Sequence, residues 1–131
     1  MNFVSKNGES RMVPFNPKKV EKPWGYEIWL ANNEHENYCA KILFIEKNKS
    51  TSMHYHLKKH ETMYVLKGTL MVDSKADRHN LGYSFSMMAK EGESMEIERG
   101  RVHKLIAHQE DLTIIEASTF HEDEDSHRIT N

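Results

Sequence analysis

The sequence has few of the features that stabilise a small secreted protein through disulfides or that anchor a protein in a membrane. It has one cysteine, Cys39, with three prolines and six glycines among 131 residues. A single cysteine cannot form an intramolecular disulfide, so we interpret Cys39 as a small buried apolar residue. No run approaches the roughly 18 apolar residues of a membrane span, and residues 1–25 lack the apolar stretch of a secretory signal. We therefore expect a cytoplasmic protein.

Neither sign of charge is in excess. The chain has 18 Lys and Arg against 20 Asp and Glu, a formal net charge of −2. This balance provides no overall attraction to nucleic acid or to an anionic membrane surface, so we expect neither as a partner. A length of 131 residues suits one domain, because two separate cores would each lie near the lower limit for stable folding.

The N-terminal part of the chain is rich in turn-forming and charged residues. Pro14, Pro17 and Pro23 lie within residues 1–23 and no apolar period is sustained there, which predicts an extended arm rather than a helix. We expect this arm to be followed by a single domain over residues 24–131. Pairing through sheet edges would cover exposed edge strands, and the arm could cross to a second subunit, so we also expect a homodimer.

The rest of the chain is divided into short apolar runs bounded by Asn, Asp, Gly, Lys and Ser clusters. Several runs alternate between apolar and polar residues, and none has the three-and-four spacing of a long amphipathic helix. We predict strands over residues 26–31, 38–46, 61–67, 69–73, 94–98, 103–107 and 111–118. This pattern predicts an all-β fold, a small sandwich or barrel. Lys67-Gly68 separates two runs and predicts a tight hairpin with Gly68 at positive φ.

Histidine is frequent, with nine in 131 residues, and its spacing indicates a metal site. His54 and His56 are two residues apart, so on a strand both side chains point to the same face. Glu61 begins the next predicted strand, and His103 begins a later one. Three imidazoles and one carboxylate suit Mn, Fe(II), Co, Ni or Zn and leave room for water or substrate. An isolated His-x-His pair would also be compatible with surface histidines on a polar strand face.

The spacing of these residues resembles the two motifs of the cupin superfamily, G-x5-H-x-H-x3,4-E-x6-G and G-x5-P-x-G-x2-H-x3-N. The corresponding series in this chain are Asn48-x5-His54-x-His56-x4-Glu61-x6-Gly68 and Gly92-x5-Glu98-x-Gly100-x2-His103-x3-Ala107. The resemblance implies a small jelly-roll β-barrel and one divalent transition metal bound by His54, His56, Glu61 and His103. Three positions depart from the pattern. Asparagine at the first tolerates a left-handed turn, whereas Glu98 and Ala107 weaken the turn and the support of the ligands.

Two flanking segments are similar to phosphomannose isomerases and to the cupin domain of bifunctional mannose-6-phosphate isomerase/guanylyltransferases. One is Pro23-Trp24-Gly25, whose tryptophan is also typical of a plug at the end of a barrel. The other is the C-terminal tail, in which Asp125 and Arg128 match family positions. By composition alone, residues 121–128 are typical of a solvated end. Those isomerase domains align Gln with His54 and Arg with Lys59, so the resemblance allows a different sugar.

The resemblance implies aldose–ketose isomerisation of a sugar or sugar phosphate through a metal-stabilised cis-enediol. A phosphate would need cationic partners, for which Lys59 and Arg128 are the first candidates because they occupy family-like positions. The catalytic residues stay unassigned, because sequence alone does not place a base at the substrate. Suitable groups are carried by His60, Tyr64, Glu98 and His127.

Other functions fit the same motifs. A site of three histidines and one glutamate with open positions also suits an Fe(II)-dependent dioxygenase or lyase. The chain could instead be a non-catalytic module that binds a metal and a sugar. A nucleotide-sugar 3,5-epimerase fits less well, because such cupins are longer and work without a metal. Oxygen consumption would identify the first, and retained metal without turnover of sugar phosphates would identify the second.

Overall fold

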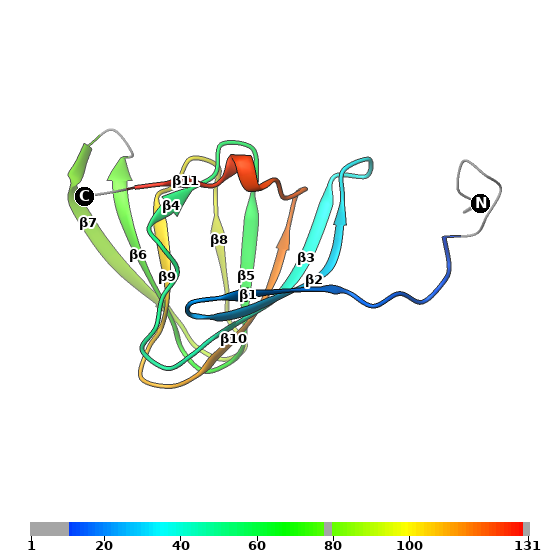
Figure 1. The fold of residues 1–131 in the computed structure, drawn as a ribbon. Helices are drawn as coiled ribbons and strands as arrows, with labels where there is room; N and C mark the ends of the chain where they lie inside the picture. The colour runs from blue at the N-terminus through cyan, green and yellow to red at the C-terminus, as the bar shows by residue number, and fades with distance from the viewer. Residues whose placement is uncertain (1–10, 78–79, 130–131) are drawn as a thin grey trace.

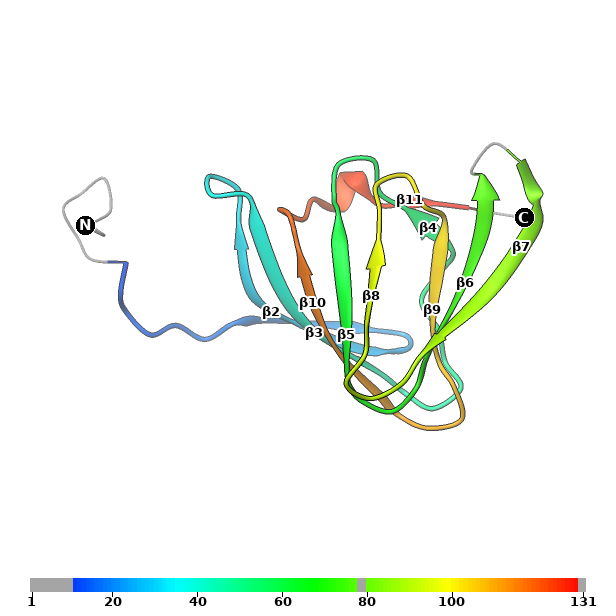
Figure 2. The same cartoon turned by 180° about the vertical axis from the view of Figure 1, so that it is seen from behind.

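The computed structural model describes residues 11–77 and 80–129. It contains the strands β1 (Lys18–Lys22), β2 (Gly25–Asn33), β3 (Tyr38–Ile45), β4 (His54–Tyr55), β5 (Glu61–Lys67), β6 (Leu70–Asp77), β7 (Asn80–Ala89), β8 (Ser94–Ile97), β9 (His103–Ala107), β10 (Leu112–Ser118) and β11 (His127–Arg128), and one 3-10 turn, η1 (Asp123–Asp125). They form two antiparallel sheets, ordered β1-β2-β3-β10-β5-β8 and β11-β4-β9-β6-β7 (Figure 1, and from behind in Figure 2).

The all-β prediction is confirmed, since each of the seven predicted runs overlaps a strand. The alternation within the runs becomes an alternation of burial, as in β3, where every second residue from Cys39 to Ile45 is buried and Ala40, Ile42 and Phe44 between them are less so. Cys39 is 3% exposed, which confirms its prediction as a buried residue. In the described part of the chain, no helix has the length and apolar character to cross a membrane.

Four strands were not predicted from sequence. β4 and β11 have two residues each, too few for a period to be recognised. β7 extends over residues 80–89 and pairs with β6. β1 lies in the region assigned to the N-terminal arm and pairs with β2 from Lys18↔Trp29 to Lys22↔Gly25. Residues 18–22 therefore belong to the sheet, and the crossing of the arm to a second subunit stays a prediction.

The predicted hairpin at Lys67-Gly68 is wrong, although its glycine conformation is right. Gly68 has φ +93°, but β5 pairs with β10 and β8, whereas β6 pairs with β7 and β9. The chain thus passes from one sheet to the other at this point. A Cβ at Gly68 would lie 2.4 Å from the carbonyl oxygen of Asp111, so a close backbone approach, as well as positive φ, requires glycine here.

The side chains that face the space between the sheets change in chemistry along the strands. At one end they form the apolar core, which we call the apolar end: Trp24, Leu43, Ile45, Met63, Val65, Leu70, Val72, Ala89, Ile97, Leu105, Ala107, Leu112 and Ile114. At the other, the polar end, inward positions carry Lys41 on β3, Glu61 on β5, His103 on β9 and Glu116 on β10, each at most 3% exposed. The two-residue period of the strands places both kinds on the same inner face.

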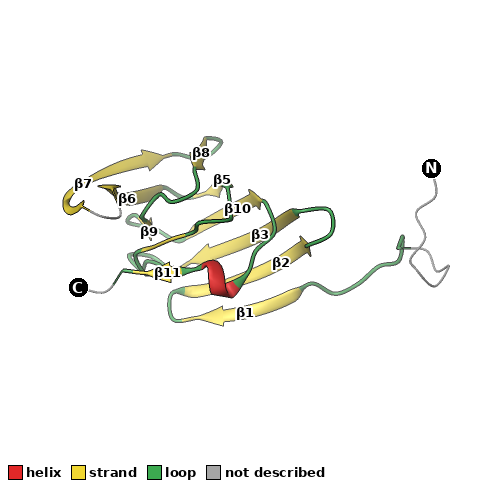
Figure 3. Ribbon diagram, turned by 90° about the horizontal axis from the view of Figure 1, so that it is seen from above, coloured by secondary structure: helices red, strands yellow, loops and turns green. Residues whose placement is uncertain are grey.

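The C-terminal segment lies over the polar end, as Figure 3 shows from above. Its β11 pairs with β4 through Arg128↔His54. On the other side, the amide N–H of His121 donates to Asn32 Oδ1 at 2.8 Å and Asn32 Nδ2 donates to the His121 carbonyl at 3.0 Å. The prediction of a solvated end is therefore wrong for His121 and Asp125, which are 8% and 4% exposed.

Candidate metal centre and cavity

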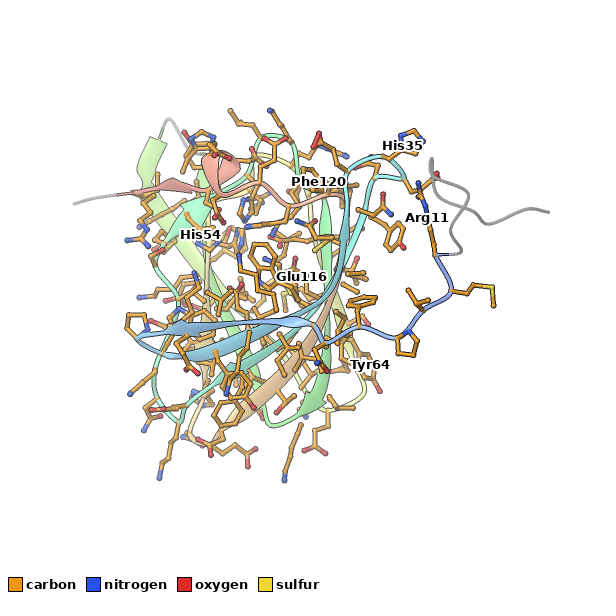
Figure 4. The ribbon with its side chains drawn as sticks, turned by 45° about the vertical axis from the view of Figure 1, so that its right-hand side comes forward. Arg11, His35, His54, Tyr64, Glu116 and Phe120 are labelled. Carbon is orange, nitrogen blue, oxygen red and sulfur yellow. The ribbon has the colours of Figure 1, made fainter. Side chains whose placement is uncertain are left out.

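A cavity of about 570 Å³ occupies the polar end. Side chains from β2, β3, β5 and β10 line it on one side, and side chains from β4, β9 and the C-terminal segment line it on the other. Figure 4 shows His54 and Glu116 within this interior, whereas His35 lies at the turn between β2 and β3, away from it. A cavity of this volume is in the range of sites for small molecules.

Three histidines converge at one side of the cavity. His54 lies on β4, His56 follows the strand, and His103 opens β9 directly opposite His54 in the strand register. One ring nitrogen of each lies within 4.8 Å of the others, a possible arrangement for binding a metal. The structure thus brings together three of the four predicted ligands as one tight group, which we call the histidine cluster.

Backbone carbonyls fix the orientation of all three rings. Nδ1 of His54 donates to the carbonyl of Ser52 at 2.8 Å, Nδ1 of His56 to that of Asp125 at 3.0 Å, and Nδ1 of His103 to that of Arg101 at 2.8 Å. A carbonyl only accepts hydrogen bonds, so Nδ1 carries the proton in each neutral ring. Each Nε2 is then left with a lone pair, the form in which imidazole binds metals.

Glu61, the fourth predicted ligand, borders this cluster. Its Oε2 lies 3.1 Å from His103 Nε2 and 3.7 Å from His56 Nε2. Oε2 of Glu61 and Nε2 of His103 are nevertheless buried without a hydrogen-bond partner. Two buried polar atoms left unpaired are costly, and a cation between them would satisfy both. The donor set of imidazole nitrogens and one carboxylate therefore fits a divalent transition metal, without selecting one.

Burial keeps His54 and His56 neutral near physiological pH. It lowers the pKa of His54 to about 3, with a further contribution from the neighbouring His103, and it lowers the pKa of His56 to about 4. Burial alone would raise the pKa of Glu61, but the charge of Lys59 and contacts with His103 outweigh it, so the pKa of Glu61 is lowered. At neutral pH His54, His56 and Glu61 therefore offer unprotonated ligand atoms, as metal binding requires.

Lys59 joins the metal centre to the far wall of the cavity. Its Nζ donates to Glu116 Oε2 at 3.2 Å and to His121 Nδ1 at 3.0 Å, and it lies 3.4 Å from Glu61 Oε1. Burial by itself lowers the pKa of Lys59, but the carboxylates of Glu116 and Glu61 more than offset it and raise the pKa. Lys59 is thus a buried ammonium shared by two carboxylates and one imidazole.

His121 completes this network with a defined tautomer. The ammonium of Lys59 can only donate, so His121 Nδ1 accepts and its Nε2 carries the proton, which it donates to Asp123 Oδ1 at 3.0 Å. Burial and the charge of Lys59 lower the pKa of His121 to about 4. His121 is therefore neutral at pH 7 and fixes the position of Lys59.

A second polar group on the cavity wall comes from β2 and β3. Lys41 Nζ lies 3.4 Å from Glu27 Oε1 and 4.3 Å from the centroid of the Trp29 ring. Trp29 Nε1 donates to the same Glu27 oxygen at 2.8 Å. Burial raises the pKa of Glu27, but Lys41, the Trp29 hydrogen bond and Lys22 together outweigh it and lower that pKa.

Both predicted substrate-binding residues line the cavity. Lys59 lies on its buried wall. Arg128 on β11 is exposed and pairs with His54 of β4. Asp125 has a different position: its carboxylate accepts hydrogen bonds from the backbone N–H groups of Leu57, Lys58 and Lys59 at 2.9 to 3.0 Å. It thereby holds the loop between His56 and Glu61, while its carbonyl orients His56.

The four sequence candidates for a catalytic group lie outside the described lining of the cavity, namely His60, Tyr64, Glu98 and His127. Tyr64 is 38% exposed because it stands between the inward residues Met63 and Val65 of β5. His60 Nε2 contacts Glu96 Oε2 at 2.6 Å on the outer surface. Proximity in sequence to the metal motif therefore did not identify the cavity side chains, because alternate residues of a strand face opposite ways.

Sequence analysis did not single out Lys41, Glu116 and His121, which the structure places in the cavity lining. A signal existed for the first two. Lys41 occupies the same phase as Leu43 and Ile45 in β3, and Glu116 the same phase as Leu112 and Ile114 in β10. A charged residue at an apolar phase of a strand indicates a buried charge, which needs a partner or a function. His121 had no such signal, because it lies outside any strand.

Three solved structures are similar in fold. CapF, a capsular polysaccharide assembling protein from Staphylococcus aureus, has a TM-score of 0.77 at 12% identity, covering 90% of this chain and 34% of its own. A variant of oxalate decarboxylase from Bacillus subtilis has 0.73 at 19%, covering 88% and 31%. KdgF from Halomonas sp. has 0.65 at 14%, covering 95% and 97%. These neighbours confirm the expected cupin jelly-roll fold.

The chain spans about a third of the CapF and oxalate decarboxylase chains, at 34% and 31%. No curated protein matches the sequence. The family model described as "Mannose-6-phosphate isomerase C-terminal" matches residues 9–131, nearly the whole chain. This match agrees with the two cupin motifs and with the histidine cluster in the cavity. The chain belongs to the cupin family of mannose-6-phosphate isomerase C-terminal domains.

Proposed function

We propose that this cupin is a metal-dependent isomerase that interconverts an aldose and a ketose, as sugars or sugar phosphates. The observation that carries the proposal is the presence, in one cavity, of the histidine cluster with Glu61 and of a separate buried carboxylate, Glu116. The first group can hold sugar oxygens through a metal. The second can move a proton between adjacent carbons, the other requirement of enediol isomerisation.

The histidine cluster and Glu61 would hold one divalent ion. When bound, such an ion supplies Lewis acidity that stabilises negative charge on the sugar oxygens of the enediolate. The contribution of the chain itself is to preset the ligands, because backbone carbonyls orient all three rings. Since an imidazole binds a metal in its neutral form, Glu61 is the single anionic ligand of the four, which favours a net positive centre beside the substrate.

Glu116 is the base of this proposal. Its Oε2 accepts from Lys59 Nζ and Ser118 Oγ, each at 3.2 Å, which leaves Oε1 for the cavity that Glu116 lines. Glu116 takes the proton from C2 of the aldose and delivers it to C1 of the ketose. The hydroxyl proton moves from O2 to O1 in the same interconversion, so no proton is gained or lost. Glu27, on the same wall, is instead bound by Trp29 and Lys41.

The roles of Lys59 and Arg128 in substrate binding are part of this proposal. Arg128 is exposed and can offer a bidentate guanidinium to a phosphate. Lys59 is buried and touches Glu116 and Glu61, so it would act on the substrate from between the base and the metal centre.

The proposal is tested by proton NMR in D2O. Anaerobically purified protein is reconstituted separately with Mn, Fe(II), Co and Zn and mixed with mannose 6-phosphate, fructose 6-phosphate, mannose or fructose. We expect metal-dependent interconversion of one pair, with deuterium entering C1 or C2. Glu116→Gln should lower kcat roughly 10²- to 10⁴-fold, the usual contribution of an acid–base group, without loss of metal. The matched control is Glu96→Gln, whose side chain is 68% exposed on the same sheet, and it should leave kcat unchanged.

Absence of exchange with every metal and sugar would contradict the isomerase. Oxygen uptake by the Fe(II) form would then identify the dioxygenase class. Retained metal without turnover or oxygen uptake would identify a non-catalytic binding module.

A further inference from the structure

The sheet β1-β2-β3-β10-β5-β8 has an apolar row on the side that faces away from the cavity. Strand register places Ile42 of β3 between Ile28 of β2 and Ile115 of β10. Ile115 in turn lies beside Tyr64 of β5. Paired residues share a face, and Ile42, Ile115 and Tyr64 alternate with buried inward residues, so the whole row points outward. Four neighbouring strands thus present one continuous apolar surface on this side.

A second pair of apolar side chains widens this row. Tyr26 of β2 is opposite Phe44 of β3, and their rings stack with centroids 5.2 Å apart. We call these six residues the outer apolar face: Tyr26, Ile28, Ile42, Phe44, Tyr64 and Ile115. Tyr64 is 38% exposed and the other five are half-buried. Soluble monomers rarely leave a contiguous apolar patch of more than a few hundred Å² in water, so this surface indicates a site of association.

The outer side of the other sheet has a different composition. Charges are interspersed along it, with Asp73 and Lys75 on β6 and Lys104 on β9, each beside a buried residue of its strand. Around the outer apolar face, charged residues stand at the margins, such as Lys19 on the edge strand β1 and Glu96 on the edge strand β8. An apolar centre with a charged rim is typical of protein interfaces. Of the two outer sides, the apolar one therefore has the composition of a buried contact.

The arm before β1 carries apolar side chains away from its own domain. Residues 11–17 are all exposed and extend outward from the strands (Figures 1 and 3). Val13 is 61% exposed and Phe15 is 71% exposed. Pro14 and Pro17 restrict the backbone of this segment, which lowers the conformational entropy that it loses on docking. An extended, proline-stiffened segment with exposed apolar side chains is suited to lie on an apolar surface of another molecule.

The dimensions of the sheet and the arm suit a second copy of this chain. Six strands with a spacing of about 4.8 Å and a length of about seven residues give a footprint of roughly 580 Å². A stable interface buries about 800 Å² on each partner, and the arm of each copy supplies the remainder. Residues 11–17 can extend over about 23 Å, close to the width of the six strands. The partner would therefore offer each arm a surface of matching length.

From these observations we infer that two copies of the chain stack through their outer apolar faces, with the arm of each copy crossing the sheet of the other. The contact is self-complementary, because a two-fold axis brings the same face together twice. Two stacked sheets lie about 10 Å apart, as in a β-sandwich. The inference is independent of the proposed function. The cavity lies on the opposite side of the sheet, so the contact leaves it accessible.

The test is sedimentation equilibrium of the full chain between about 0.1 and 100 µM. We expect wild type to have a mass of about 31 kDa, twice the 15.4 kDa of one chain. Tyr64→Glu places one carboxylate on each copy, hence two in the contact, and should raise the dissociation constant of the dimer roughly 100-fold. Because Tyr64 is already 38% exposed in the single chain, this variant should fold, with the circular dichroism spectrum of wild type. Tyr64→Phe should remain dimeric.

The matched control is Met88→Glu, since Met88 is 51% exposed on the other sheet, and it should dimerise like wild type. Phe15→Ser tests the arm and should raise the dissociation constant roughly 10-fold, because a buried aromatic side chain is lost from the contact. A monomeric wild type at 100 µM would overturn the inference. So would a dimer of wild-type affinity in Tyr64→Glu, which would indicate pairing through the strand edges. An unchanged dissociation constant in Phe15→Ser would overturn the crossing of the arm.

Discussion

The apolar and polar ends of the molecule are built on the same strands, yet they bury side chains of opposite kinds. β10 contributes Leu112 and Ile114 to one end and Glu116 to the other, and β9 contributes Ala107 and then His103. At the apolar end, each fully buried leucine or isoleucine contributes roughly 1.5–3 kcal/mol through removal of its surface from water. At the polar end, burial of charge costs free energy that pairing only partly returns.

The difference shows how a small fold can hold a site in which several charged side chains are buried. The apolar end supplies the stability, and its strands continue as a rigid frame into the polar end. There Lys59 with Glu61 and Glu116, and Lys41 with Glu27, hold ionised groups at 2 to 4% exposure, apart from Glu27 at 13%. The comparison predicts that substitutions at the apolar end alter the free energy of unfolding, and that substitutions at the polar end alter ligand binding.

The largest expected effect is the loss of the metal in His103→Ala. Removal of one of four ligands should reduce metal content from about one ion per chain to a small fraction of that. The melting temperature measured with metal should fall as well, because a metal that binds only the folded chain stabilises it. Metal analysis and thermal unfolding check this, with His35→Ala, 84% exposed, as control. Full metal content in His103→Ala would contradict a metal centre at these residues.

At the apolar end, Leu112→Ala should have the converse effect. Leu112 is 0% exposed, and truncation of a buried leucine costs about 2–5 kcal/mol of unfolding free energy. Metal affinity should be retained in the folded fraction. Urea unfolding of metal-free protein measures the loss of unfolding free energy, and metal titration measures the metal affinity. The matched surface control is Leu66→Ala, since Leu66 is 52% exposed. A Leu112→Ala variant as stable as wild type would break the assignment of stability to this end.

Asp125→Asn should produce a smaller loss, because Asp125 touches the ligands indirectly. Its carboxylate holds the backbone of residues 57–59, and its carbonyl orients His56. Groups that support metal ligands typically contribute 10- to 100-fold in affinity, and we expect a weakening of roughly this size in a metal titration. Glu124→Gln, an exposed neighbour in η1, should leave the affinity unchanged. Wild-type affinity in Asp125→Asn would show that the loop holds its shape without this carboxylate.

The last expected effect is a pH dependence of stability that originates at the polar end. Burial lowers the pKa of His56 and of His121 to about 4, from 6.5. Between about pH 6.5 and 4, the unfolded chain therefore binds protons that the folded metal-free protein does not. Stability is fully present above pH 6.5 and falls as the pH drops, by at most about 1.4 kcal/mol per pH unit for each histidine. Urea unfolding at pH 7.5, 6 and 5 measures this slope. His35→Gln should leave it unchanged, and a flat profile in wild type would contradict the neutral buried histidines.

Periodicity and spacing predicted much of the framework and the metal centre. Seven strands followed from alternation because one face of each strand must be apolar where it meets the core. The grouping of His54, His56 and Glu61 followed because a period of two and a short turn restrict where their side chains can lie. These are local constraints, and neighbouring residues are sufficient to express them. His103, which is distant in sequence, was a candidate from its place at the start of a predicted strand, and the resemblance to cupins supported its inclusion.

Such local constraints do not predict the contacts between strands that lie far apart in the sequence. Lys67-Gly68 has the local sequence of a hairpin, but β5 pairs with β10 and β8 instead of β6. Lys41 and Glu116 lie 75 positions apart and become direct neighbours through strand pairing. The tail over residues 121–128 has the composition of a solvated end, yet Asp125 is buried because it satisfies the backbone N–H groups of a loop that lies far from it in sequence.

The amino-acid sequence by itself determined that this protein is all-β, that it carries a metal motif and that its family is that of cupins related to mannose-6-phosphate isomerase. Those properties reside in periods and spacings along a short stretch of chain. Only the tertiary structure decided which charges face the cavity and which partners surround each buried lysine. The physical reason is that the environment of a buried charge is made by partners from other strands, and strand pairing alone brings them within hydrogen-bond distance.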